Sequence, residues 1–469
     1  MLTLTRIKQN LITSIARSKP LLFAISCTIC NSQANAAGTA GGFKEALESA
    51  ISNDLGLKKA FHQYQATQQE DDISFANLLP SVNLNALYQY EKSDNIYTDE
   101  GSSSFDPNLE RSGGELNDYY WRISLRQPLF DYSSYKGYQR DKAFVDAARF
   151  RYEREEQELI YRVAQQYLSV LFASQSVYLN QDKLKALELK LKQETRTQEL
   201  GVGNRLNVLR ATSSRDLARS DLLSSQSELK DAKTLLRNIT GSDIQIQQSW
   251  IENGHKLNPN LLTGNENEWI TTIYNNANIK EAKSTIQRHE YDVSATKAQH
   301  LPTLSFNLSY LDRTSEDNFR TREDFVASLE FSMAIYSGGR ISANVKKAAA
   351  ELQATQVDLD YLLAEKTQLV QLAYNRLISF KDRLNALIES EKSSRALLEA
   401  AERQQALNLG DQIEVLEART QLVDIQIQFA KTLNDYLLAD LNLRLETGQL
   451  DQNRLEIYDR LFTDVSMMN

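Results

Sequence analysis

Two glutamates, Glu414 and Glu417, stand three residues apart in the stretch LNLGDQIEVLEART, which begins at Leu407 and reads as helix after a glycine. Residues at this spacing share a helix face, and like charges there repel each other. Taken alone, the pair is most simply a solvated face near a helix start, where the helix dipole favours acids.

Other residues give no support to catalysis. The histidines lack metal-ligand spacing, and Gly201-Val-Gly203 is followed by Leu206, so it is not a dinucleotide-binding loop. The sequence has no phosphate-binding loop and no Gly-x-Ser-x-Gly elbow. The net charge is −9, and it becomes more negative without the basic N-terminal residues, which argues against nucleic-acid binding. We therefore expect no enzyme, no cofactor, no metal site and no nucleic-acid partner. The four histidines are His62, His255, His289 and His300.

The N-terminus has the layout of a secretory signal peptide. A basic start precedes the short apolar run LLFAISCTIC, and Ala34-Asn35-Ala36 is a small-residue cleavage pattern. We expect residues 1–36 to be removed and the chain to be exported. Both cysteines, Cys27 and Cys30, lie in this leader; a lipoprotein signal ending at Cys27 is the alternative. The basic residues are Arg6, Lys8, Arg17 and Lys19.

Two long tracts, Gly137 to Gly201 and Gly339 to Gly410, contain no internal proline or glycine. Each could form one helix of roughly 95 to 100 Å. Apolar residues recur at spacings of three and four within them, which indicates a packed seam with polar flanks. No run of 18 apolar residues follows the leader, so membrane residence would have to come from strands.

The sequence also repeats itself. ANLLPSVNLNALYQY from Ala76 resembles AQHLPTLSFNLSYLD from Ala298, and GVGNRLNVLRA from Gly201 aligns without gaps on NLGDQIEVLEA from Asn408. A duplicated unit is the simplest interpretation. The first copy has a longer connection, DEGSSSFDPNLERSGGE, which we expect to be an exposed hairpin tip.

Four segments alternate strictly between apolar and polar residues, as amphipathic strands do. Aromatic residues gather toward their ends, as in transmembrane barrels. Two hairpins on a soluble core would explain the alternation equally well, but the strand length of about ten residues favours a membrane barrel. Four strands cannot close one, because open edges in lipid leave backbone groups unpaired. Several chains must therefore share it.

Together the stretches HLPTLSFNLSY, IYSGGRISANVKKA and LLRNITG, with the two glycine-to-helix elements, resemble the TolC family of Gram-negative outer-membrane efflux and secretion channels. The likeness runs from about Phe43 to Leu450. It implies an α+β membrane protein: a homotrimer whose 12-stranded β-barrel, four strands per chain, continues into a long periplasmic α-helical barrel, with mixed structure at the waist.

The expected organisation follows this pattern. After the leader, residues 37–241 form the first repeat: a helix, strands at about 81–92 and 118–130, and long helices at about 138–200 and 204–238. Residues 242–268 form an equatorial segment. The second repeat, 269–447, has a helix, strands at about 303–313 and 324–336, and long helices at about 340–407 and 411–446. Residues 448–469 form a second, C-terminal equatorial segment, at the waist of the helical barrel.

The resemblance places the periplasmic tip turns at Gly201, Gly203, Asn408 and Gly410, and it changes the interpretation of the acids. In the family, the second-copy acids that match Glu414 and Glu417 line the narrowest point of the channel, where concentrated negative charge favours cations. The first copy departs from this pattern, with Asn207 and Arg210 at the equivalent places. The family's tyrosine, arginine and aspartate bridges are replaced by Gln405, Gly410 and Asn207.

We therefore expect an outer-membrane exit duct of a tripartite efflux pump or type I secretion system. The channel would be passive and trimeric, opened at its tip by a periplasmic adaptor and an inner-membrane transporter, either ABC-type or proton-driven. Its remaining partner would be outer-membrane lipid. The alternative is a periplasmic coiled-coil scaffold or adaptor without a barrel. The cargo stays open among drugs, metal ions and proteins.

Overall fold

The computed structural model describes residues 42–93, 114–244, 264–316, 320–407 and 411–450. These belong to one compact unit, Ala40–Asn469; the other unit, Met1–Thr39, lies outside the described ranges, as do the expected leader, Asn408 and Gly410. The expected hairpin tip lies outside them as well, except for Gly114 and Glu115, which begin a strand. Of the expected equatorial segments 242–268 and 448–469, residues 245–263 and 451–469 also lie outside them.

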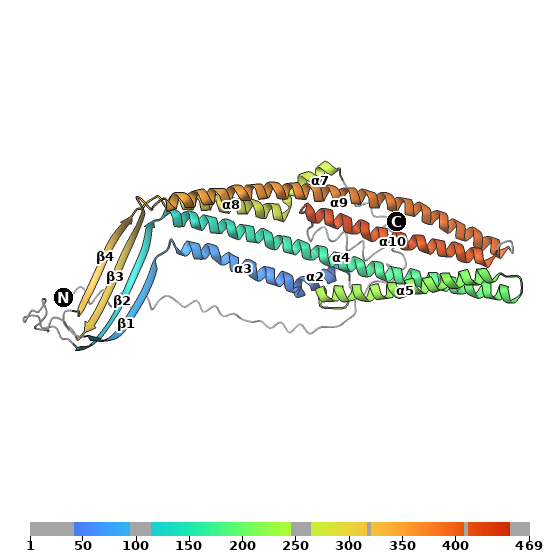
Figure 1. Ribbon diagram of the computed structural model, residues 1–469, viewed down its shortest axis with the longest axis horizontal. Coiled ribbons are helices and arrows are strands. Elements are labelled where there is room, and N and C mark those ends of the chain that lie inside the picture. The colour runs from blue at the N-terminus through green and yellow to red at the C-terminus, as the bar shows by residue number, and fades with distance from the viewer. Residues whose placement is uncertain (1–41, 94–113, 245–263, 317–319, 408–410, 451–469) are drawn as a thin grey trace, which may run out of the picture. The chain divides into compact units, whose positions relative to one another are not determined.

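Figure 1 shows the element order. The first repeat contains α2 (Phe43–Asn53), α3 (Leu55–Ala76), β1 (Ser81–Ser93), β2 (Gly114–Phe130), α4 (Tyr132–Glu199) and α5 (Arg205–Thr240). The second contains α7 (Glu266–Thr272), the short η2 (Ile273–Asn275), α8 (Ala277–Ala298), β3 (Thr303–Ser315), β4 (Arg322–Ser332), α9 (Arg340–Ala406) and α10 (Gln412–Glu446). The order of helices and strands is thus the same in both halves.

The longest helix, α4, begins at Tyr132 and contains Gly137 in its second turn. It can begin this early because Asp131 caps it: the backbone N–H and the hydroxyl of Ser134 both donate to the Asp131 carboxylate, at 3.0 and 2.7 Å. With 68 residues it is about 100 Å long. No helix among the described residues combines the length and the apolar character needed to cross a membrane.

The four strands form one antiparallel sheet in the order β1-β2-β3-β4 (Figure 1). Ser81 pairs with Arg126 at one end of β1 and β2, and Thr303 pairs with Ser332 at one end of β3 and β4. The β2–β3 register shifts between Pro128 and Phe130, where proline offers no N–H to the ladder. β1 and β4 are the two edges of this sheet within the described residues.

The helices pack side by side: α4 contacts α3, α5, α8 and α10, while α9 contacts α8 and α10. The main hydrophobic core lies where α2, α4, α7, α8, α9 and α10 meet, and the Phe43 and Tyr167 rings make an edge contact at 5.5 Å between centroids. Its largest fully buried side chains also include Tyr436, Phe429, Leu159 and Leu377. Burial in this core binds the two repeats together.

Candidate functional site: the helical tip and the two faces of the sheet

The sheet has one apolar and one polar face, because side chains alternate along each strand. Cross-strand partners share a face, so Leu84, Ile123, Tyr310 and Phe325 form one row. Large apolar residues of this face are exposed, from Trp121 at 37% to Phe325 at 70%. Exposed apolar patches of this extent mark a surface that contacts something other than water.

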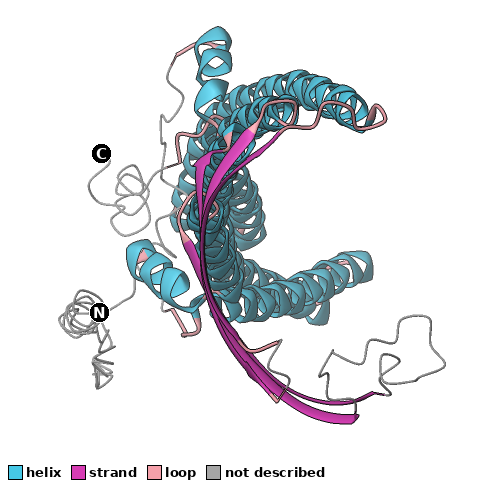
Figure 2. Cartoon of the chain, turned by 90° about the vertical axis from the view of Figure 1, so that its left-hand side faces the viewer, coloured by secondary structure: helices cyan, strands magenta, loops and turns pink. Residues whose placement is uncertain are grey.

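The opposite face carries polar residues. Asn85, Arg122 and Leu311 form one of its rows, and Ser81, Arg126 and Asn307 another. Figure 2 shows the sheet curving strongly. Side chains crowd together on the inside of a curve, and buried positions such as Asp118, Ser305 and Leu311 all belong to this face. We therefore assign the polar face to the concave side of the sheet.

Ion pairs organise the end of the polar face that is furthest from the long helices. The Arg313 guanidinium donates to both oxygens of the Asp118 carboxylate, which is 3% exposed. Nearby, Arg320 lies 2.7 Å from Glu91, and the Glu316 carboxylate accepts hydrogen bonds from the side chain and backbone of Asn117. These contacts connect β1, β2 and β3 where the strands end.

At the other end of the long helices, the α4–α5 turn depends on two glycines. Gly201 has φ of +77°, a left-handed conformation that glycine adopts without cost. At Gly203 a Cβ would lie 2.6 Å from the backbone nitrogen of Gln198. The N–H groups of Val202 and Gly203 both donate to the carbonyl of Thr197, and Asn204 caps α5. The predicted turn residues Gly201 and Gly203 therefore do lie in a tight helix-to-helix turn.

The predicted acids lie on the first turns of α10. Asp411 caps this helix by accepting from the N–H of Ile413 at 3.3 Å. Glu414 and Glu417 are both exposed on the same side of the helix. The Glu414 side chain makes no hydrogen bond or ion pair with the other described residues, whereas the Lys190 ammonium of α4 donates to Glu417 Oε1 at 2.5 Å. The two acids therefore differ: among the described residues, Glu417 has a cationic partner and Glu414 has none.

Two more ion pairs connect α4 to α10 near the tip, and reasoning from the sequence missed both. The Arg419 guanidinium donates to both oxygens of Asp182, at 2.7 and 3.2 Å. Lys183 lies 2.9 Å from Asp424 and 3.6 Å from Asp221 of α5. Partners more than 200 residues apart become visible only when the packing register of the helices is known. Three ion pairs thus hold the start of α10 against α4.

The other predicted tip residues are not brought into this cluster. Asn207 and Arg210 are exposed on α5, and Gln405 is half-buried near the end of α9. Asn207 and Arg210 make no ion pair or side-chain hydrogen bond within the described ranges. The described residues also contain no group of three His, Cys, Asp or Glu side chains placed to hold a metal ion.

A second charge cluster, which the sequence did not reveal, joins the helices at the end of α10. The Glu446 carboxylate accepts from the Lys366 ammonium of α9 at 2.6 Å and from the Arg154 guanidinium of α4 at 3.2 Å. Arg154 also donates to Glu158, and Asn276 donates to the Glu446 carbonyl at 2.8 Å. Burial, followed by the Glu446 charge, raises the pKa of the neighbouring Tyr161. This equatorial cluster connects α4, α8, α9 and α10.

A sheet with an exposed apolar face and a polar concave face defines a class of protein that sits in a membrane through strands. Here those strands continue into long polar helices. The family model described as outer membrane efflux protein matches residues 46–242 and 271–449. The chain belongs to this family, and the two matched segments correspond to the two repeats. It is an outer-membrane efflux or secretion channel of the TolC type, a transport protein and not an enzyme.

Relatives of known name cover nearly the whole chain. It is 25% identical to the proteases secretion protein PrtF of Dickeya chrysanthemi over 95% of this chain and 96% of that protein. It is 24% identical to the alkaline protease secretion protein AprF of Pseudomonas aeruginosa, over 93% and 89%. Identity to the outer membrane protein TolC of Escherichia coli is 23%, over 85% and 80%.

Solved structures share the fold. The Campylobacter jejuni CmeC outer membrane channel superposes with a TM-score of 0.70 at 15% identity, covering 90% of each chain. CusC gives 0.69 at 16% identity, covering 87% of this chain and 92% of that one. The expected architecture, two repeats that together provide four antiparallel strands per chain and long helices, is thereby confirmed.

Proposed function

We propose that this chain works as a homotrimer whose twelve strands close one barrel in the outer membrane. The support comes from the sheet: its apolar face is exposed, and β1 and β4 each leave one edge open. Open strand edges in lipid leave N–H and C=O groups unsatisfied, each at a cost of several kcal/mol. Copies of the same chain remove these edges when β1 of one pairs with β4 of the next.

At the periplasmic tip we propose that Glu414 and Glu417 line the narrowest part of the pore, with Asn207 and Arg210 on the neighbouring helices. Glu414 supplies a negative charge that no described residue of its own chain neutralises. The tip turns at Gly201, Gly203, Asn408 and Gly410 would place the helix starts around this constriction. Opening would separate α10 from α4, which breaks the pairs of Lys190 with Glu417 and of Asp182 with Arg419.

The proposed cargo is polypeptide. The observation that carries this proposal is the end-to-end match to two protease secretion proteins, PrtF and AprF. The chain would then act as the exit duct of a type I secretion system, in which a periplasmic adaptor and an inner-membrane ABC transporter dock at the tip. Energy would come from the transporter, because the channel itself only provides the path.

Complementation tests this cargo assignment. A strain that carries a protease transporter and its adaptor, but lacks their outer-membrane component, would receive this chain. We expect protease activity to appear in the culture medium. A parallel strain lacking the outer-membrane component of a drug pump serves as the comparison. Restored drug resistance without protease secretion, with the chain present in the outer membrane of both strains, would contradict the cargo assignment and favour small-molecule efflux.

A further inference from the structure

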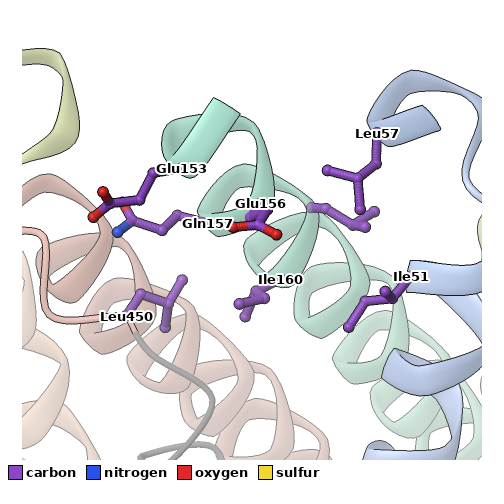
Figure 3. A pocket seen from close by; sticks show the side chains of 8 residues that line it. Ile51, Leu57, Glu153, Glu156, Gln157, Ile160 and Leu450 are labelled. Carbon is purple, nitrogen blue, oxygen red and sulfur yellow. The ribbon is translucent and has the colours of Figure 1, made fainter. Parts of the chain in front are cut away.

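A cavity of about 260 Å³ lies beside α4, away from both the tip and the sheet. Ile51 of α2 and Leu57 of α3 form one side, and Leu450, which follows α10, forms the other (Figure 3). The lining is completed by five residues of α4: Glu153, Glu156, Gln157, Leu159 and Ile160. An ordered water occupies about 30 Å³ of liquid volume, so the cavity has room for a ligand of several heavy atoms.

The polar groups of this cavity have an incomplete set of partners. Gln157 is only 8% exposed, and its Oε1 atom accepts no hydrogen bond from any described residue. Glu153 lies 3.6 Å from Lys280, and the Tyr152 hydroxyl hydrogen-bonds to Glu156. Burial, followed by that hydrogen bond, raises the pKa of Tyr152 to about 12, so the hydroxyl keeps its proton at neutral pH. A buried acceptor left unsatisfied costs about 1–3 kcal/mol, which a donor from a ligand would recover.

The chemistry of the lining specifies the ligand. An amide oxygen and two carboxylates offer acceptors and negative charge, and Glu156 has no cationic partner among the described residues. The apolar side chains opposite them suit methylene groups. We propose that this cavity binds a primary ammonium or guanidinium group carried on a short aliphatic stem. The cationic head donates to Gln157 Oε1 and to Glu156, and the stem packs against Ile51, Leu57 and Leu450.

The cavity also joins segments that are far apart in the sequence. Leu450 reaches it because Gly448 has φ of +66° and lies so close to η2 that a Cβ would come within 2.5 Å of the Asn275 carbonyl oxygen. A ligand that contacts Leu450, Leu57 and Gln157 therefore bridges the end of α10 to α3 and α4. Because it binds only when these segments are packed, it raises the thermal stability of the channel.

Two sources can supply this cationic group. One is a free alkylamine. The other is the chain itself, because the residues after Leu450 include Arg454 and Arg460, whose guanidinium groups sit on aliphatic stems. The two sources differ in one respect: a free amine binds to the unaltered channel, whereas a group from the chain competes with it.

The test is calorimetric titration of the detergent-solubilised full chain with n-hexylammonium chloride, with 1-hexanol as the uncharged comparison. We expect saturable binding of the amine at one site per chain and none of the alcohol. Glu156→Gln and Gln157→Leu should each weaken binding by about tenfold or more, the value of a hydrogen bond to a charged group. Glu188→Gln, an exposed acid elsewhere on α4, should leave it unchanged.

The same titration on a chain carrying Arg454→Gln and Arg460→Gln identifies the source. Saturable binding that appears only in this background, and is again lost with Glu156→Gln, shows that the chain's own arginine occupies the cavity. Circular dichroism and the thermal midpoint of each variant establish that it is folded. Unsaturable uptake of the amine, equal in both backgrounds and in the Glu156→Gln variants, would overturn the proposal.

Discussion

Replacing Glu446 with alanine tests the equatorial cluster. This carboxylate accepts from Lys366 and Arg154 at 2.6 and 3.2 Å, and all three side chains are at most 11% exposed. Arg154 keeps Glu158 and the Leu445 carbonyl when Glu446 is lost, but Lys366 has no other hydrogen bond or ion pair within the described residues. A buried charge left without its partner costs about 3–5 kcal/mol. We therefore expect Glu446→Ala to be strongly destabilising.

The matched variant replaces both partners. Lys366→Met with Glu446→Leu removes the stranded ammonium and keeps the volume filled, and such exchanges are often neutral. The assay is the thermal midpoint of the detergent-solubilised channel by circular dichroism, scanned at one fixed rate because large membrane assemblies unfold irreversibly. We expect the single variant to melt well below the double variant. Equal midpoints for the single variant and the parent, or a double variant as unstable as the single one, would refute the assignment.

Two further predictions concern the tip turn and the sheet. Gly203→Ala puts a Cβ 2.6 Å from a backbone atom, so amide hydrogen exchange of residues 195–210 should accelerate. Gly137→Ala is the control: a Cβ there has nothing within 4 Å, and the substitution should stabilise α4 by about 0.5–1 kcal/mol. Equal exchange in both variants would contradict the turn geometry. Ile123→Arg, on the apolar face, should destabilise the folded protein in the membrane by about 2–4 kcal/mol and lower the amount of the protein in the outer-membrane fraction. Ser124→Arg, next to it on the polar face, should have little effect, and the reverse ranking would show that the faces are assigned wrongly.

Much of the fold could be predicted because its local signals agree. Strict alternation indicated the strands, and the repeat of GVGNRLNVLRA as NLGDQIEVLEA indicated two copies of one unit. Glycine and asparagine at equivalent positions indicated the tip turns, of which the one at Gly201 is described. These features depend on neighbours in sequence, or on patterns that are independent of packing.

The ion pairs could not be predicted, because they depend on the packing register between distant helices. Nothing near Glu417 in the sequence points to Lys190, and nothing near Glu446 points to Lys366. As a result, Glu414 and Glu417 appeared equivalent from spacing alone, although within the described part of the chain only Glu417 has a cationic partner. The simple interpretation of both acids as a solvated helix face was likewise made without knowledge of how α4 and α10 pack.

Single-channel recording in a planar bilayer is the most direct test of a pore shared by several chains and narrowed by the tip acids. The parent channel should conduct poorly and prefer cations, because negative charge in a constriction attracts them. Glu414→Ala with Glu417→Ala should raise the conductance and move the K⁺/Cl⁻ permeability ratio toward one. Glu188→Ala with Glu228→Ala removes the same charge from exposed positions of α4 and α5 and should change neither. Unaltered conductance and selectivity in the Glu414 and Glu417 double variant would contradict the account.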